Sequence, residues 1–176
     1  VLRPTREREA YPGYKFGLTD EEASETLRLP LDGLPDLDED GKATVDVSVE
    51  EAPATTQLVV ADIVIRMQEA GGRAVERKLT LPVKPDGPRI GIKPEFASDL
   101  PENAVANFHL IGIDADGQRL PLQGLGWKLL KVEQEYQWYR EGSAWRFEPV
   151  TRTSQVSDGR VDLEQEGARI SMPVTW

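Results

Sequence analysis

The sequence offers many carboxylates and almost nothing that could work with them. Of its 176 residues, 31 are Asp or Glu, one is histidine and none is cysteine. Glycosidases use carboxylate pairs about 5–10 Å apart, but no spacing here singles out such a pair. Serine nucleophiles need a partner base and thiolates need cysteine. The Gly-containing stretches at 71–72 and 124–126 precede predicted strands rather than helices, so they are not phosphate cradles. We therefore expect no enzymatic activity and no cofactor.

The single histidine, His109, lies in "ANFHLIGID", a strand-like pattern of alternating residues. A lone histidine of this kind is typical of a surface or half-buried strand position. We do not expect it to act as a catalytic base or as a metal ligand.

An acidic segment, "PDLDEDGKATVDVSVE", resembles the first half of an EF-hand calcium loop through Asp36, Asp38, Asp40 and Gly41. The twelfth loop position should be a bidentate Glu, but here it is Val47, and no flanking helices are predicted. The segment therefore indicates an acidic turn before a strand, with no metal bound. The alternative, an enzyme accessory domain with a calcium turn, would be distinguished by calcium titration.

Five aromatic rings fall within twelve positions of "EQEYQWYREGSAWRFEPV". With a four-residue turn at residues 140–143, the two flanking strands form a hairpin. Strand alternation then places four of the rings on one face. The predicted cross-strand pairs join Trp138 to Trp145 and Tyr136 to Phe147. We expect this cluster (Tyr136, Trp138, Trp145 and Phe147) to pack as the edge of a core, since aromatic stripes more often pack than bind. The alternative is a platform on which a ligand stacks.

The remaining pattern is that of strands. Apolar residues alternate in "ATVDVSV" (43–49), and two long strands flank the Gly-rich turn 70–72 within residues 57–83. Only "DEEASETL" (20–27) resembles a helical turn. Strands separated by Gly, Asp and Pro at intervals of about 8–12 residues are typical of antiparallel β-sandwiches. The sequence thus predicts an all-β protein.

A domain boundary is predicted at Pro85-Asp86-Gly87-Pro88, which cannot continue a β-ladder. Residues 1–85 form a first block with a long irregular opening. Residues 88–176 form a second block, the size of one sandwich, with about seven predicted strands. These are "RIGIKP", "AVANFHLIGID", "QRLPLQ", "GWKLLKVEQEYQWYR", "AWRFEPVTRTSQV", "GRVDLE" and "ARISMPV", with "DADG" and "SDG" read as turns. We expect relative motion between the blocks, as is usual across a Pro/Gly linker.

The net charge of −10 makes nucleic acid an improbable partner, because phosphate binding needs a basic surface. No apolar run is long enough to span a membrane. The sequence starts at Val1 without an initiator methionine, and we expect it to be part of a longer polypeptide.

Four stretches in this order resemble consecutive segments of bacterial alpha-2-macroglobulins, and together they cover nearly the whole chain. They are "YPGYKFGLTDEE", "LPLDGLPDLDEDGKATVDV", "GGRAVERKLTLPVKP" and "YQWYREGSAWRFEPVTR". The resemblance implies two tandem macroglobulin-type β-sandwiches. The first, 1–85, would lack its opening strands, and the second, 88–176, its last strand.

The same resemblance also implies the location, the activity and the partners of the full-length protein. Bacterial alpha-2-macroglobulins are periplasmic lipoproteins, anchored to the inner membrane, that trap proteases. The implied partners are the other domains of the same polypeptide and, through the full-length protein, target proteases. The family's thioester and lipid anchor both require cysteine, so both would lie outside this cysteine-free chain. Residues 19–41 make poor protease bait, and no binding residue is carried over. A carbohydrate-binding or adhesive sandwich using the Trp/Tyr surface remains the alternative.

Overall fold

The computed structural model describes residues 1–19, 21, 26–31, 34–49, 52–68, 71–142 and 144–175. Within these ranges the chain is all-β, as predicted, and its strands pair antiparallel. The strands are β1 (Leu2–Thr5), β2 (Lys15–Phe16), β3 (Leu58–Gln68), β4 (Ala74–Val83), β5 (Arg89–Pro94), β6 (Val105–Ile113), β7 (Leu122–Glu141), β8 (Ala144–Leu163) and β9 (Ala168–Pro173). The described residues include no helix that is both long and apolar enough to cross a membrane.

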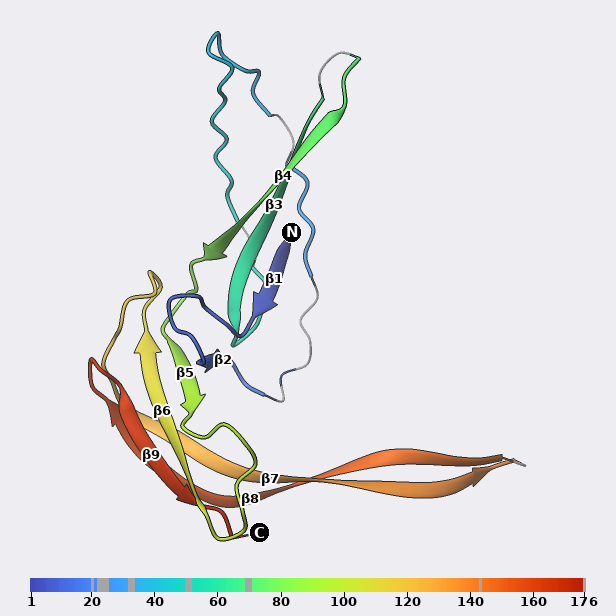
Figure 1. The fold of residues 1–176 in the computed structure, drawn as a ribbon, viewed down its shortest axis with the longest axis vertical. Helices are drawn as coiled ribbons and strands as arrows, with labels where there is room; N and C mark the ends of the chain where they lie inside the picture. The colour runs from blue at the N-terminus through green and yellow to red at the C-terminus, as the bar shows by residue number, and fades with distance from the viewer. Residues whose placement is uncertain are drawn as a thin grey trace.

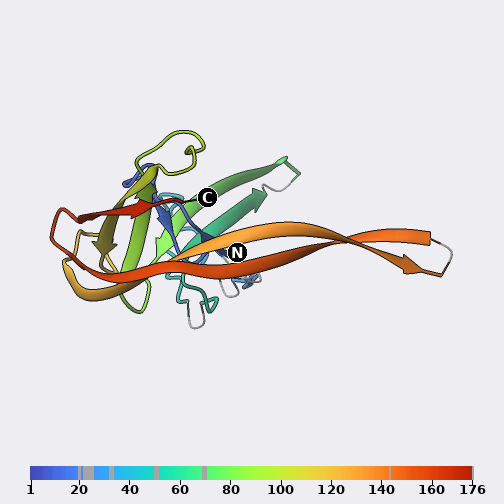
Figure 2. The ribbon, with the colours of Figure 1, turned by 90° about the horizontal axis from the view of Figure 1, so that it is seen from below.

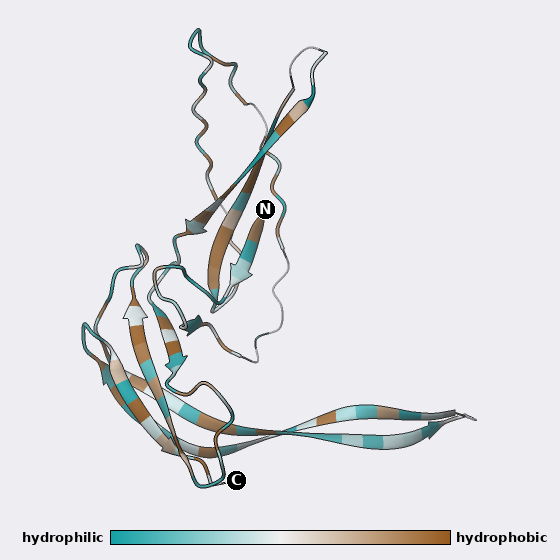
Figure 3. Cartoon of the chain, viewed as in Figure 1, coloured by the Kyte–Doolittle hydropathy of each residue, from teal (hydrophilic) through white to brown (hydrophobic). Residues whose placement is uncertain are grey.

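The first sheet has the order β1-β3-β4 (Figure 1). Its β3–β4 hairpin confirms the two long strands predicted around the Gly-rich turn, of which Ala70 lies outside the described residues. Strand β3 is hydrophobic from Leu58 to Ile65 apart from Asp62, as its mostly brown colour shows (Figure 3). Asp62 is a buried charged residue whose carboxylate contacts Arg3, Lys78 and Thr80.

The strand predicted at residues 43–49 is not formed. Val45 and Val47 lie in irregular chain and are exposed, without a ladder partner among the described residues. Alternating valines suit an extended backbone, but a strand also needs a neighbour whose N–H and C=O groups complete its hydrogen bonds. The helical turn suggested at 20–27 falls mostly on residues outside the description.

The second sheet has the order β2-β5-β6-β9. Its strands β5, β6 and β9 coincide with three of the predicted segments, and His109 is half-buried in β6 as expected. The "DADG" sequence forms the predicted turn, in which the Asp114 carboxylate accepts hydrogen bonds from the N–H groups of Asp116 and Gln118.

Two predicted strand divisions are wrong. The "QRLPLQ" segment forms only a bridge between Arg119 and Ile113 before β7 begins, and β8 runs through the predicted "SDG" turn without interruption. Gly159 of that turn pairs with Trp127, whose indole lies where a Cβ would stand. The continuous partner strand thus overrides the local turn preference of Asp158-Gly159.

Strands β7 and β8 form a two-stranded hairpin, with 20 residues in each strand. Its base lies beside the second sheet, and its outer half extends away from the rest of the molecule as a twisted ribbon (Figures 1 and 2). Register shifts occur at Leu122/Leu125 and at Leu129/Leu130, near the base.

The main buried cluster lies where the two sheets meet. It contains Phe16, Leu58, Ile111 and Ile113. Leu58 belongs to the first sheet, whereas the isoleucines belong to β6 of the second. Phe16 comes from the early part of the chain but pairs with Gly91 in the second sheet. Residues on both sides of the predicted boundary therefore share one core.

Candidate interaction surface and the joint between the sheets

The hairpin brings together the four aromatic residues singled out in the sequence, but in a different register. Trp138 pairs with Phe147, Tyr136 with Pro149 and Arg140 with Trp145, so the predicted Trp138–Trp145 and Tyr136–Phe147 pairs are wrong. The ladder continues to Glu141–Ala144, which leaves a two-residue loop instead of four. Gly142 in that loop has a φ of 63°, a left-handed conformation that glycine adopts without strain. Ser143 lies outside the described residues.

The same side chains still share one face, because the observed register differs from the predicted register by two residues along β8. A shift of two residues leaves every side chain on its own side of the strand. We define the aromatic face as the side of the outer hairpin that carries Tyr136, Trp138, Trp145, Phe147 and Pro149, together with Leu130, Val132, Gln134 and Arg140. Phe147 is its centre. The Phe147 ring centroid lies 6.0 Å from that of Tyr136 and 5.4 Å from that of Trp138. Both arrangements fall within the range of favourable aromatic pairs.

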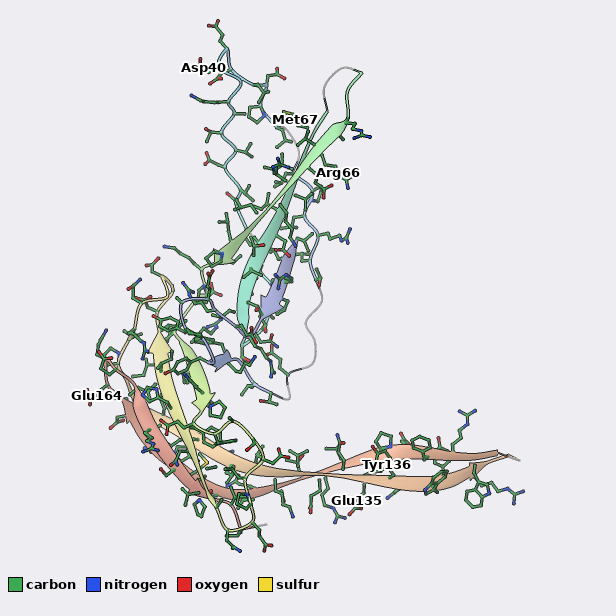
Figure 4. All side chains as sticks on the ribbon, in the orientation of Figure 1. Asp40, Arg66, Met67, Glu135, Tyr136 and Glu164 are labelled. Atoms are coloured by element: carbon green, nitrogen blue, oxygen red, sulfur yellow. The ribbon has the colours of Figure 1, made fainter. Side chains whose placement is uncertain are left out.

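These rings are not the edge of a core within the described chain. The exposed fractions are 62% for Tyr136, 66% for Trp138, 67% for Trp145 and 59% for Phe147. Figure 4 shows the side chains of the outer hairpin standing clear of the other elements. Packing between the rings is thus limited to one face of a two-stranded ribbon, which has no second layer here. The prediction that this stripe is packed is wrong for the described residues.

The opposite face of the same ribbon is charged. It carries Lys131, Glu133, Glu135, Arg146, Glu148 and Arg152. Lys131 and Glu133 form an ion pair with a 2.7 Å N–O distance, and the hydrogen bond from Lys131 lowers the pKa of Glu133. The aromatic face, by contrast, has Arg140 as its single charged residue. The hairpin therefore gathers most of its charged side chains on one face and most of its aromatic rings on the other.

A second group of residues connects the two sheets where they meet, at the turn 114–118. We call this contact region the joint. The turn 114–118 of the second block is held by three residues from the first. The Tyr11 hydroxyl donates to the carbonyl of Gly117 over 2.8 Å, and Arg8 donates to the carbonyl of Asp116 over 3.3 Å. The Lys84 ammonium lies 2.5 Å from the Asp116 carboxylate, and this contact raises the pKa of Lys84.

Next to this turn, Tyr14 contacts the histidine, and Tyr11 in turn packs edge to face against Tyr14. The Tyr14 hydroxyl is 2.8 Å from Nδ1 of His109, and the two rings meet edge to face. The Arg119 guanidinium lies over both Tyr11 and Tyr14, at 5.2 and 5.9 Å from the ring centres. His109 thus has a structural role as a half-buried strand residue that fixes Tyr14.

Sequence reasoning missed this joint. The contacts come from "YPGY", Tyr11 to Tyr14, within the stretch interpreted as irregular opening. The signal was two tyrosines in an otherwise polar segment, since rings of this size usually find a partner. What the sequence could not show is that the partner lies about a hundred residues further along the chain.

The acidic segment is a turn, as predicted. One carboxylate oxygen of Asp38 accepts hydrogen bonds from the backbone N–H groups of Asp40 and Lys42, at 3.0 and 2.7 Å. Over the described part of the chain, no group of three His, Cys, Asp or Glu side chains is placed to hold a metal ion. The chemistry of Asp38 here is that of a turn-forming acceptor.

Family models match both parts of the chain. The model of the bacterial alpha-2-macroglobulin MG5 domain matches residues 1–85, and that of bacterial macroglobulin domain 6 matches residues 91–176. Among curated relatives, alpha-2-macroglobulin of Escherichia coli K12 is 28% identical over 196 residues, which covers 99% of this chain. The Xylella fastidiosa (strain Temecula1) protein is 26% identical over 172 residues, or 94% of this chain. The chain spans only 12% and 10% of these two relatives.

Solved structures of alpha-2-macroglobulins from E. coli and Salmonella share the fold, and each comparison covers 99% of this chain. The native conformation of E. coli alpha-2-macroglobulin, seen by cryo-EM, has a TM-score of 0.72 at 27% identity over 12% of that chain. The Salmonella protein reacted with methylamine has a TM-score of 0.73 at 25% identity, and this chain covers 12% of it. The E. coli protein activated by porcine elastase has a TM-score of 0.72 at 29% identity, and this chain covers 16% of it. The chain belongs to the bacterial alpha-2-macroglobulin family, and it spans two consecutive macroglobulin-domain matches.

Proposed function

We propose that this chain is a structural part of a protease inhibitor that works by trapping its target. The observation that carries the proposal is the pair of family matches, which follow each other in order over residues 1–85 and 91–176. E. coli relatives described as activated by porcine elastase and by trypsin support the proposal that the parent protein meets proteases of this kind. In this proposal the chain itself is not an enzyme and holds no catalytic residue.

Within that inhibitor, the chain would serve as a stiff spacer between the domains on either side. The buried cluster of Phe16, Leu58, Ile111 and Ile113 supports this role, because it is shared by both sheets. The hydrogen bond from Tyr11 to Gly117 adds a polar contact across the same joint. A spacer of this kind would keep distant domains apart and would transmit their movement after a protease cuts the parent.

The domain division, 1–85 and 88–176, is part of the proposal. Residues 84–88 lie between β4 and β5 outside any strand, which supports a boundary there. However, the segment 8–16 contacts the second sheet, so each domain would be stable only with the other in place.

We further propose that the parent is a periplasmic lipoprotein anchored to the inner membrane, with the anchor outside this chain. The support is the family membership and the Gram-negative relatives in E. coli and X. fastidiosa. Fractionation of cells that express the full-length protein would check the location.

One observation favours a second function. The indoles of Trp138 and Trp145 are both exposed on the same face of the hairpin, and sugars commonly stack on exposed indoles. Calorimetric titration with bacterial polysaccharide fragments would reveal this activity, and Trp138→Ala should then abolish it. The trapping proposal predicts no heat of binding.

The proposed function is tested with the full-length protein and elastase. We expect the full-length protein to suppress digestion of a large protein substrate while small peptide substrates are still cleaved, because a trapped protease excludes only large molecules. The isolated 176-residue chain, which has no cysteine and therefore no thioester, should inhibit neither reaction. Unchanged digestion of the large substrate by elastase in the presence of the full-length protein would refute the proposal.

A further inference from the structure

We propose that the aromatic face of the β7–β8 hairpin is a docking surface for another domain of the same polypeptide. This inference rests on the family membership and not on protease trapping itself. The domain it contacts would present an apolar surface, with an acidic or carbonyl group near Arg140.

The separation of residue types first indicates that the face is made to be covered. Antiparallel sheets with one apolar and one polar face usually bury the apolar one. Among the described side chains of the outer hairpin, the opposite face carries six charged residues, whereas the aromatic face carries only Arg140. A two-stranded ribbon alone is marginally stable in water, so an outer half of this length needs a second layer.

The size of the face leads to the same conclusion. With 59–67% of each of the four aromatic residues exposed, these rings alone present about 500 Å² of apolar surface, given about 150–250 Å² for a whole aromatic residue. That area is at the upper end of the patches found on monomeric proteins, which are about 300–600 Å² and often functional. It also approaches the area of contacts between domains of one chain, about 600–1,500 Å².

Another domain of the same polypeptide is the occupant that the observations favour. Curated relatives are so long that this chain covers only 10–12% of their length, so a polypeptide of that length would have many further domains able to contact the hairpin. A domain linked by the chain is present at an effective concentration in the millimolar range, which a free partner does not reach.

Other occupants fit the face less well. A membrane surface attracts clusters of Lys and Arg, but the aromatic face has one Arg and the chain a net charge of −10. A sugar requires polar groups that bond its hydroxyls. The aromatic face offers such groups only singly, at Gln134, at the Tyr136 hydroxyl and at Arg140, whose Nε already donates to the carbonyl of Gly142.

The test is hydroxyl-radical labelling of the full-length protein, with Tyr139 as an internal reference. Tyr139 lies on the charged face of the same strand and is 42% exposed, compared with 66% and 67% for Trp138 and Trp145. If the aromatic face is covered, both tryptophans should be oxidised at least about fivefold more slowly than Tyr139, as residues in the core of an interface. Oxidation of the tryptophans at least as fast as that of Tyr139 would overturn the proposal.

Protection that depends on an added component would also overturn the proposal, because it would identify a different occupant of the aromatic face. Protection that grows with protein concentration would indicate a second copy. Protection that requires added polysaccharide or anionic phospholipid vesicles would indicate a sugar or a membrane.

Two matched variants test the face itself in the full-length protein. Gln134→Glu places a negative charge on the aromatic face, and Gln137→Glu places the same charge on the opposite face of the same strand. We expect the first variant to restore oxidation of Trp138 several-fold and the second to leave it unchanged. Equal effects of both variants would contradict docking through this face. Elastase inhibition, measured on the same samples, separates the two proposals, because full inhibition with unprotected tryptophans overturns only the docking.

Discussion

At the residue scale, Asp62 shows how one buried charge organises a sheet. Its carboxylate accepts hydrogen bonds from Arg3 Nε at 2.7 Å and from Thr80 Oγ1 at 2.6 Å, and Lys78 lies 3.4 Å away. The partners come from β1 and β4, on either side of β3, which carries Asp62. Hydrogen bonding to Arg3 holds the pKa of Asp62 well below its ordinary value, followed in effect by Thr80. A buried charge persists in a fold only when it is paired in this way.

Replacement of Asp62 tests this network through its pH dependence. Because the folded-state pKa is depressed, the carboxylate stabilises the fold fully above its unfolded-state pKa of about 3.9, and this contribution is lost as the pH falls below that value. We expect Asp62→Asn to lower the free energy of unfolding by about 1–3 kcal/mol at pH 7. The difference in the free energy of unfolding between the variant and the wild type should shrink as the pH falls from 4 to 2, as urea titrations at each pH would show. A deficit that stays constant with pH would mean that packing, and not charge, is what Asp62 provides.

Gly91 shows how a missing side chain shapes the joint. A Cβ at this position would lie 2.8 Å from two carbons of the Phe16 ring, which is fully buried and cannot move aside. We expect Gly91→Ala to cost about 1–3 kcal/mol, as for other overpacked cores, measured by urea unfolding. Gly126→Ala is the matched control, since nothing lies within 4 Å of its would-be Cβ. Equal stability of the two variants would show that the Phe16 ring is not held in place.

At the element scale, the sequence of the β7–β8 hairpin predicts which side chains share a face, but it does not predict the register of the two strands. Strand alternation determined the face correctly, because moving the register by two residues keeps every side chain on its side. The register depends on loop length. Both a four-residue loop at 140–143 and the observed two-residue loop place the same rings together, so hydrophobic pattern could not choose between them. The two-residue strand β2 was beyond prediction for a related reason, since its pairing with β5 is a contact between distant parts of the chain.

The observed register predicts unequal roles for two aromatic residues on the same strand. Phe147 contacts both Tyr136 and Trp138, whereas Trp145 is opposite Arg140. In this chain we expect Phe147→Ala to destabilise the outer hairpin by about 0.5–1.5 kcal/mol and Trp145→Ala by less than about 0.5 kcal/mol. Amide hydrogen exchange of residues 135–140 measures both. A larger loss with Trp145→Ala would contradict this register and would support the pairing of Trp145 with Trp138 that a four-residue loop at 140–143 predicts.

At the scale of the whole molecule, residues 1–85 and 88–176 form one stiff unit in this account. The Pro/Gly-rich stretch 85–88 predicts two domains that move independently, because no local pattern indicates contacts across it. The structure adds a buried cluster shared by both sheets and the contacts of Tyr11 and Lys84 with the turn 114–118. A stiff unit can hold other domains of an inhibitor at a fixed spacing, whereas a flexible one cannot.

The direct measurement is the distribution of distances between the sheets. Because the chain has no native cysteine, spin labels can be placed uniquely with Arg77→Cys on β4 and Val105→Cys on β6. Pulsed electron double resonance should then give one narrow distance distribution, and Phe16→Ala should broaden it by opening the shared cluster. A broad distribution in the labelled chain with Phe16 intact would show that the blocks move independently, and it would contradict the spacer account.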